Sequence, residues 1–166
     1  MKVGDVLDEP ADALLSTANP WLAMSGGVNG AILQRGNDGI AEELRRHLSE
    51  HGLRTVPQGS VVRASAGNLK ARVLLPCVAV NAFYESSPEV IRSTVDRALR
   101  MAAVEGARTV AMPMLATGFG PLRAEDFASG VAALSGPYGS VETLVIVVRK
   151  EEERDAIRRV IPTPSA

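Results

Sequence analysis

The sequence has little of several features that mark particular classes of protein. It has one cysteine, Cys77, so an internal disulfide is excluded, and a secreted disulfide scaffold with it. Its 18 basic and 19 acidic side chains nearly cancel, which argues against a protein that coats nucleic acid. No apolar run approaches the roughly 20 residues needed to cross a bilayer, and the start of the chain lacks the apolar segment of a signal peptide. These absences favour a cytoplasmic protein that has neither a membrane nor a nucleic acid as its partner.

Aromatic residues are also scarce, at 4% of the 166 residues, whereas 46% of the chain is hydrophobic. A core built from this composition must consist of aliphatic side chains, and its size is ordinary for one globular domain. We see no linker or internal repeat. The sequence therefore predicts a single domain over residues 1–161, followed by a frayed tail at 162–166 that contains two prolines.

Short apolar runs alternate with helical segments along the chain. Five runs read as strands, and they are continuous rather than alternating in polarity, as in parallel strands that are covered on both faces: 13–18, 61–64, 73–80, 109–115 and 143–148. Helices are predicted at 28–34, 45–51, 151–161 and from Ser87 to Gly106, where Ser87 and Pro88 give a good start and Gly106 a stop. This alternation predicts an α/β layered fold with a largely parallel sheet.

Two glycine-rich loops, 19–30 and 116–121, follow predicted strands directly. Open α/β sheets hold their ligands at this edge, where the strands end. The first loop also opens the helix at Val28, and the unpaired N–H groups of a helix N-terminus suit a phosphate. Glycines that merely turn the chain are the alternative for either loop alone, but two such loops at one edge favour an anionic ligand that spans both.

Four segments, in order, are similar to one family. Gly4-Asp5-Val6 resembles Gly-Asp-Ile, and residues 12–19 resemble Asp-Ala-Ile-Val-Asn-Ala-Ala-Asn. Residues 25–32 resemble Gly-Gly-Gly-Val-Asp-Gly-Ala-Ile, and residues 113–118 resemble Pro-Ala-Ile-Gly-Thr-Gly. Together they identify the chain as similar to the macrodomains, the ADP-ribose-binding family that includes the bacterial Appr-1''-P processing proteins.

The resemblance implies a three-layer α/β/α fold with a mixed, largely parallel sheet, which binds free ADP-ribose or an ADP-ribosylated protein without metal or cofactor. It implies that Asp5 and Val6 hold the adenine and that Asn19 faces the distal ribose. The diphosphate would lie between two groups of residues: Ser25, Gly26, Gly27 and Val28 on one side, and Ala116, Thr117, Gly118, Phe119 and Gly120 on the other. Arg149 falls where relatives often place an aromatic residue against the base; it either stacks on the adenine or only caps the last strand.

Departures from the family bear on catalysis. Family hydrolases carry an acid at the position of Asn29, and an amide cannot act as a general base at neutral pH. Three further positions differ as well: the chain has Leu33 where the family has a histidine, Ser16 where it has an asparagine, and Pro121 where it has a loop glycine. A mono-ADP-ribosyl or O-acetyl-ADP-ribose hydrolase is therefore the alternative function, with Asn19 and Asn29 as the candidate catalytic residues and weakened turnover.

Several other possibilities stay open or are set aside. A binder of RNA or poly(ADP-ribose) ends, and a degenerate pocket closed by Pro121 and Trp21, are further alternatives, and the oligomeric state is undetermined. The segment 47–51 fits the H-x-x-E-H zinc pattern, but the chain has no third histidine, so we interpret it as a solvated helix face. Tyr84 follows a strand at the ligand edge and could form part of a pocket wall.

Overall fold

The computed structural model describes residues 1–161 and contains one sheet of six strands in that range. Its spatial order is β1-β6-β5-β2-β4-β3. The strands are β1 Lys2–Val3, β2 Ala13–Thr17, β3 Ala64–Ser65, β4 Val73–Cys77, β5 Thr109–Met112 and β6 Thr143–Val148. All neighbours pair in parallel except β3 and β4, which are antiparallel. The mixed, largely parallel sheet predicted from the sequence is confirmed.

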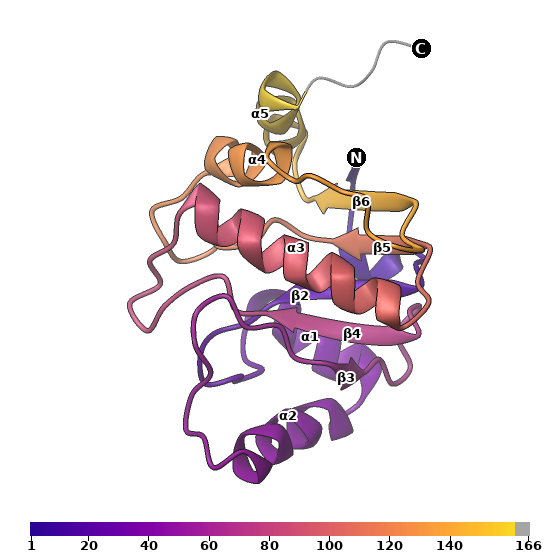
Figure 1. The fold of residues 1–166 in the computed structure, drawn as a ribbon, viewed down its shortest axis with the longest axis vertical. Coiled ribbons are helices and arrows are strands. Elements are labelled where there is room, and N and C mark those ends of the chain that lie inside the picture. The colour runs from indigo at the N-terminus through magenta and orange to yellow at the C-terminus, as the bar shows by residue number, and fades with distance from the viewer. Residues whose placement is uncertain (162–166) are drawn as a thin grey trace.

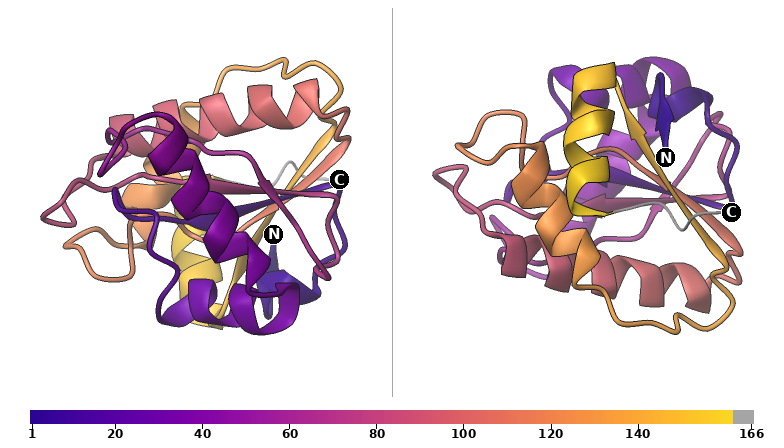
Figure 2. Two further views of the ribbon diagram at one scale, coloured as in Figure 1. Left: turned by 90° about the horizontal axis from the view of Figure 1, so that it is seen from below. Right: turned by 90° about the horizontal axis from the view of Figure 1, so that it is seen from above.

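Five α-helices cover the two faces of this sheet within residues 1–161. They are α1 Gly27–Gly36, α2 Gly39–Glu50, α3 Pro88–Val104, α4 Ala124–Ala132 and α5 Glu151–Val160, and a short 3-10 helix, η1, spans Val6–Asp8. The buried side chains fall into two clusters, one on each face: α3, α4 and α5 pack on one, and η1, α1 and α2 on the other. In the left view of Figure 2, α3 and α1 lie on opposite sides of the strands. The fold is therefore the predicted three-layer α/β/α arrangement.

Alternate residues of the central strands point into opposite layers. Leu15 and Leu75 belong to the cluster under α3, whereas Leu14 and Leu74 belong to the cluster over α1 and α2, and all four are at most 3% exposed. Because both faces are buried, these strands need apolar residues at every position. This requirement explains the continuous apolar runs in the sequence.

Helix α3 forms where its sequence predicts. The Ser87 hydroxyl accepts a hydrogen bond from the Val90 N–H at 3.3 Å, and Pro88 occupies the first turn. The apolar stripe that begins at Ile91 is buried against the sheet. The helix ends at Val104, and Gly106 takes the left-handed conformation, with φ of 73°, that turns the chain into β5.

Other boundaries differ from the prediction. The helix predicted at 45–51 begins six residues earlier, at Gly39, after a turn in which the Asn37 side chain accepts the Gly39 N–H at 3.0 Å. Helix α4 was not predicted. The strand predicted at 61–64 is reduced to β3 and an isolated bridge from Val61 to Cys77, and the predicted tail at 162–166 lies outside the described residues.

The parallel strands bring their carboxyl ends to one edge. Thr17 of β2 pairs with Cys77 of β4, and Met112 of β5 pairs with Ile146 of β6. In Figure 1 the arrows of β4 and β5 point the same way. The loops that follow β2 and β5 therefore meet at this edge. Among the described residues no helix combines the length and apolar character needed to cross a membrane.

Candidate functional site

A cavity of about 560 Å³ opens at the carboxyl edge of the sheet. Its floor consists of the strand ends and the first residues after them, and its walls are the two glycine-rich loops. The lining includes 12 of the 14 residues predicted from the sequence: Asn19, Ser25, Gly26, Gly27, Val28, Asn29, Ala116, Thr117, Gly118, Phe119, Gly120 and Arg149. Loops that are about 90 residues apart in the sequence thus form one cavity.

The first loop presents bare backbone to the cavity. Gly26 and Gly27 have φ of 66° and 51°, a region that side chains rarely adopt, and a Cβ on either would meet no heavy atom within 4 Å. Helix α1 begins at Gly27, and no side chain caps its N-terminus. The first-turn N–H groups and the positive end of the helix dipole are consequently open to an anion.

The second loop is held against the loop that follows β4. A Cβ on Gly120 would collide with the carbonyl oxygen of Tyr84, so only glycine allows this close approach. The Tyr84 and Phe119 rings lie 5.7 Å apart between centroids, tilted by 60°. Ala116 and Tyr84 are both left-handed, with φ of 62° and 59°. Non-glycine residues in this conformation cost free energy and often occur at ligand sites.

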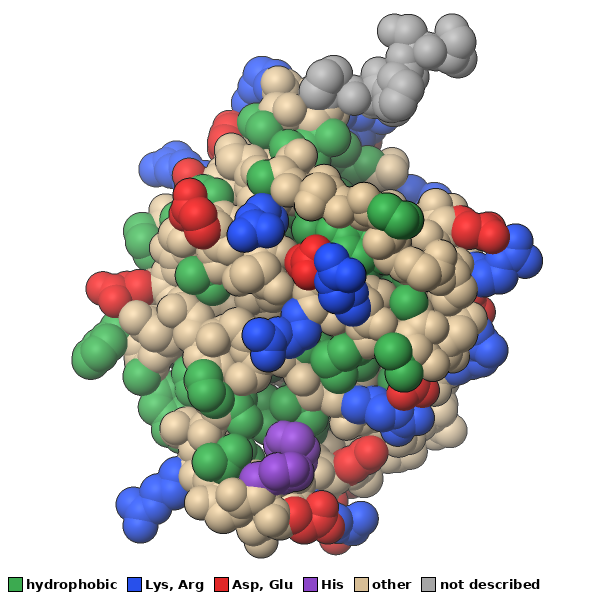
Figure 3. Space-filling view, viewed as in Figure 1, with side chains coloured by type: hydrophobic (Ala, Val, Ile, Leu, Met, Phe, Trp, Pro, Cys, Tyr) green, Lys and Arg blue, Asp and Glu red, His purple; other side chains and the backbone are tan. Residues whose placement is uncertain are grey.

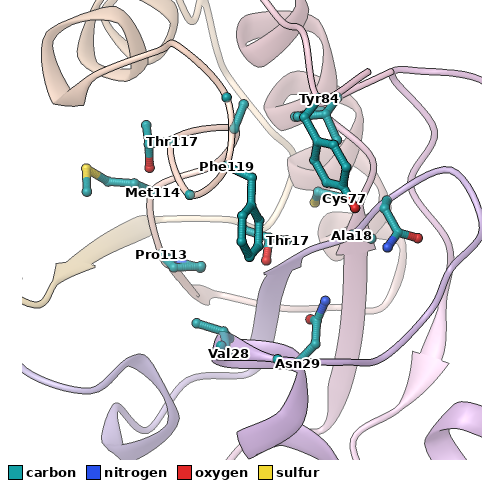
Figure 4. A pocket seen from close by; sticks show the side chains of 18 of the residues that line it. Thr17, Ala18, Val28, Asn29, Cys77, Tyr84, Pro113, Met114, Thr117 and Phe119 are labelled. Carbon is teal, nitrogen blue, oxygen red and sulfur yellow. The ribbon is translucent and has the colours of Figure 1, made fainter. Parts of the chain in front are cut away.

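Asn29 lies on the first turn of α1 and lines the cavity (Figure 4). Its side chain is 9% exposed, and its Oδ1 has no hydrogen-bond partner among the described residues. A buried acceptor without a partner costs free energy unless a ligand or water satisfies it. Asn19 is different, because its Oδ1 already accepts the Ala23 N–H at 3.1 Å. Its amide nitrogen is therefore the part that it can offer to a ligand.

The far end of the cavity lies beside the end of β6. Val147, Val148 and Arg149 line it, together with Glu153 from the first turn of α5. The Glu153 carboxylate accepts the backbone N–H groups of Arg149 and Lys150 at 3.0 and 3.1 Å, which fixes the turn between strand and helix. Within the described lining, Arg149 and Glu153 are the only charged residues.

Asp5 and Val6 do not line the cavity. The Asp5 carboxylate accepts the Leu7 N–H at 2.9 Å and one Arg35 guanidinium nitrogen at 3.0 Å, and the Val6 side chain is buried in the core. The segment is nevertheless near the site, because the N–H of the preceding Gly4 donates to the Val148 carbonyl oxygen at 2.8 Å. Arg35 is a partner of Asp5 that sequence reasoning missed.

Sequence reasoning also missed the cavity floor. Strand-end residues line it, among them Thr17, Cys77, Val80, Pro113 and Met114. Burial raises the pKa of the Cys77 thiol far above its ordinary value, so it is a neutral thiol and no nucleophile at physiological pH. Tyr84 does line the cavity, as a wall residue should.

Of the residues that depart from the family pattern, only Asn29 lines the cavity among the described residues. Ser16, Leu33, Pro121 and Trp21 are all absent from the lining. Ser16 belongs to β2 and is fully buried, and Trp21 and Pro121 leave the cavity open. In the part of the chain that the structure describes, no group of three or more metal-binding side chains comes together. The His47 and His51 rings, purple in Figure 3, stack on each other at 4.4 Å.

A three-layer α/β/α fold with glycine loops and a helix N-terminus at the carboxyl edge of its sheet is the arrangement in which open α/β proteins hold ligands. The Macro domain family profile matches residues 15–130, and the chain belongs to this family. An uncharacterised protein of Pyrobaculum aerophilum is 34% identical over 153 residues, which cover 90% of this chain and 82% of the relative. A macro domain-containing protein of Streptomyces coelicolor is 39% identical over 116 residues, 69% of either chain.

Solved structures agree on the fold. The Oceanobacillus iheyensis macrodomain with ADP superposes with a TM-score of 0.84 at 19% identity, covering 96% of this chain and 87% of that one. The Trypanosoma brucei macrodomain in complex with ADP-ribose gives a TM-score of 0.77 at 20% identity, over 96% and 67% of the two chains. At this level of identity the likeness shows the fold alone.

Proposed function

We propose that this macrodomain, a single domain over residues 1–161, binds ADP-ribose, either free or attached to a protein. The observation that carries the proposal is the meeting of two bare glycine loops, a free helix N-terminus and the unpartnered Asn29 in one cavity. Its volume, about 560 Å³, lies within the range of small-molecule sites. The ADP and ADP-ribose bound by the Oceanobacillus and Trypanosoma macrodomains support the same ligand class.

In this proposal the diphosphate lies between the two loops. Backbone N–H groups of residues 26–28 and 117–120 would surround it, with Ser25 and Ala116 at the loop margins. Among the described residues the lining contains no lysine, and its one arginine, Arg149, is at the far end. Fixed dipoles rather than mobile cations would therefore hold the negative charge. Affinity should change little with salt, unlike that of a nucleic-acid binder.

The two ends of the ligand would meet different surroundings. Adenine would lie at the end beside Val148. There Asp5, close to Val148 through the Gly4 hydrogen bond, would accept its amino group, the Val6 backbone would support the ring, and the Arg149 guanidinium would stack on it. The distal ribose would lie near Asn19, Asn29 and Phe119, where the carboxamides can exchange hydrogen bonds with its hydroxyls.

Hydrolysis is the second candidate function, and Asn29 decides how strong it can be. The only carboxylate in the described lining, Glu153, lies at the adenine end and is engaged by two backbone N–H groups. No carboxylate is therefore available to activate water at the distal ribose. Turnover would depend on the substrate's own phosphate and on orientation by Asn19, so the proposal is a binder with weak or no hydrolase activity. We also propose that the protein is cytoplasmic and that it is related to the Appr-1''-P processing proteins.

Titration with ADP-ribose by calorimetry tests the proposal. We expect a dissociation constant in the micromolar range, about −8 kcal/mol at 1 μM. AMP should bind much more weakly, because it occupies only the adenine end. The absence of both heat and a thermal shift at millimolar ADP-ribose would refute ADP-ribose binding.

A further inference from the structure

Most of the few aromatic side chains lie in the loops at the carboxyl edge of the sheet rather than in the core. The chain has three Phe, two Tyr and one Trp, and four of these six side chains lie in the loops at the carboxyl edge and are 36–86% exposed: Trp21, Phe83, Tyr84 and Phe119. Hydrophobic side chains appear in Figure 3 along the left margin, the side to which the arrows of β4 and β5 point in Figure 1. Exposed apolar groups gathered in this way mark a surface that contacts another molecule.

Phe83 is the most informative of the four. It is 82% exposed and does not line the cavity. Its loop is nevertheless tightly held, because the Asn81 Oδ1 accepts the N–H groups of Phe83 and Glu85 at 2.9 and 3.0 Å, and the Gln58 amide donates to the Glu85 carbonyl at 2.9 Å. The next residue, Tyr84, adopts the unfavourable φ of 59°. A rigid, strained loop that holds an aromatic ring in water is preorganised for contact.

The exposed rings continue the cavity wall outward. Tyr84 lines the cavity and lies against the Phe119 ring, and Phe83 directly precedes Tyr84. This is the end of the cavity that the proposed function assigns to the distal ribose. Whatever is attached to that ribose would leave the cavity past these rings.

We propose that Phe83, together with the exposed faces of Tyr84 and Phe119, contacts an apolar side chain of the polypeptide to which ADP-ribose is attached. This inference rests on the proposed function and names its substrate class. Loops 19–26, 81–87 and 116–120 contain no lysine or arginine, and Glu85 is their only acid. A nucleic acid attached to the ribose would find no cation there for its phosphates, whereas an apolar side chain meets aromatic surface.

Two peptides of equal length and charge test the proposal. Both carry ADP-ribose on the same residue through a hydrolysis-resistant linkage, and the neighbouring residues are leucine in one peptide and serine in the other. Wild-type protein should bind the leucine peptide about tenfold more tightly, since roughly 50 Å² of additional buried apolar surface corresponds to that ratio. Phe83→Ser should reduce the ratio to near one and leave the affinity for free ADP-ribose within twofold. Val104→Ser is the matched control, because Val104 is 88% exposed at the opposite end of α3 and its loss should leave the ratio unchanged.

The outcomes separate the two proposals. Binding of free ADP-ribose with equal affinity for both peptides would overturn the role of the aromatic rings and leave the proposed function intact. The role of the rings is likewise overturned if Phe83→Ser retains the tenfold ratio, or if an ADP-ribosylated oligonucleotide binds more tightly than the leucine peptide. Failure to bind free ADP-ribose would overturn the proposed function itself, and with it the inference that the aromatic rings contact the attached polypeptide.

Discussion

Gly27→Glu tests the phosphate loop most directly. Gly27 lines the cavity, and a Cβ there would meet no heavy atom of the rest of the chain within 4 Å, so a longer side chain has room at this position. There it would occupy the space proposed for the diphosphate and carry a charge of the same sign. Two unit charges about 5 Å apart repel by about 3 kcal/mol at an effective dielectric constant of 20, which corresponds to more than a hundredfold loss of affinity. Calorimetric titration with ADP-ribose measures the loss.

The same substitution also strains the backbone. Gly27 has φ of 51°, and a side chain in the left-handed region costs about 1–2 kcal/mol. Gly27→Ala carries this strain without charge or bulk, so it separates the two effects. Both variants should melt a few degrees lower, but Gly27→Ala should retain most of its affinity. Unchanged ADP-ribose binding by folded Gly27→Glu would show that the diphosphate does not lie at this loop.

Two further substitutions address chemistry and stability. Asn29→Asp restores a carboxylate of nearly the same shape and should raise hydrolysis of ADP-ribosylated glutamate by about 10²–10⁴-fold over the wild type, without tightening ADP-ribose binding; strong wild-type turnover in that assay would contradict the reasoning. Asp12→Ala should cost about 1–3 kcal/mol, since the carboxylate accepts the backbone N–H groups of Thr109 and Arg108 at 3.0 and 2.8 Å. These hydrogen bonds lower the pKa of Asp12, so its stabilisation is full above the unfolded pKa of about 3.9 and is lost as pH falls through the lower folded value. Melting curves of the wild type and Asp12→Ala should therefore converge in acid.

The sequence predicts the part of the fold that its local pattern determines. Continuous apolar runs identify β2, β4, β5 and β6, and Ser87 with Pro88 identifies the start of α3. Helix α4 was not predicted because it is short and its start is marked only by a local capping contact. In this contact the Asp126 carboxylate accepts the backbone N–H of Arg123 at 2.8 Å. Helix α2 starts at Gly39, directly after Asn37 and Asp38, and this sequence context normally predicts a turn rather than a helix.

The site, too, consists of residues that the sequence identifies and residues that only tertiary contacts bring in. Glycine loops can be recognised from the sequence, and 12 of 14 predicted residues line the cavity. Tertiary contacts decide the rest. Glu153 reaches the cavity because the chain turns directly from β6 into α5, and Arg35 meets Asp5 from 30 positions away. Neither residue has a local pattern that distinguishes it from an ordinary surface charge.

The pairing of β1 with β6 affects the order in which the protein can be assembled. Lys2 and Val147 are partners in the sheet, although they lie at almost opposite ends of the described chain. During synthesis β1 emerges long before β6, so β1 stays unpaired while the central strands associate. Non-local parallel pairing of this kind slows folding. Asp5 lies two residues after β1, so the adenine end of the proposed site would be completed only when the last strand docks.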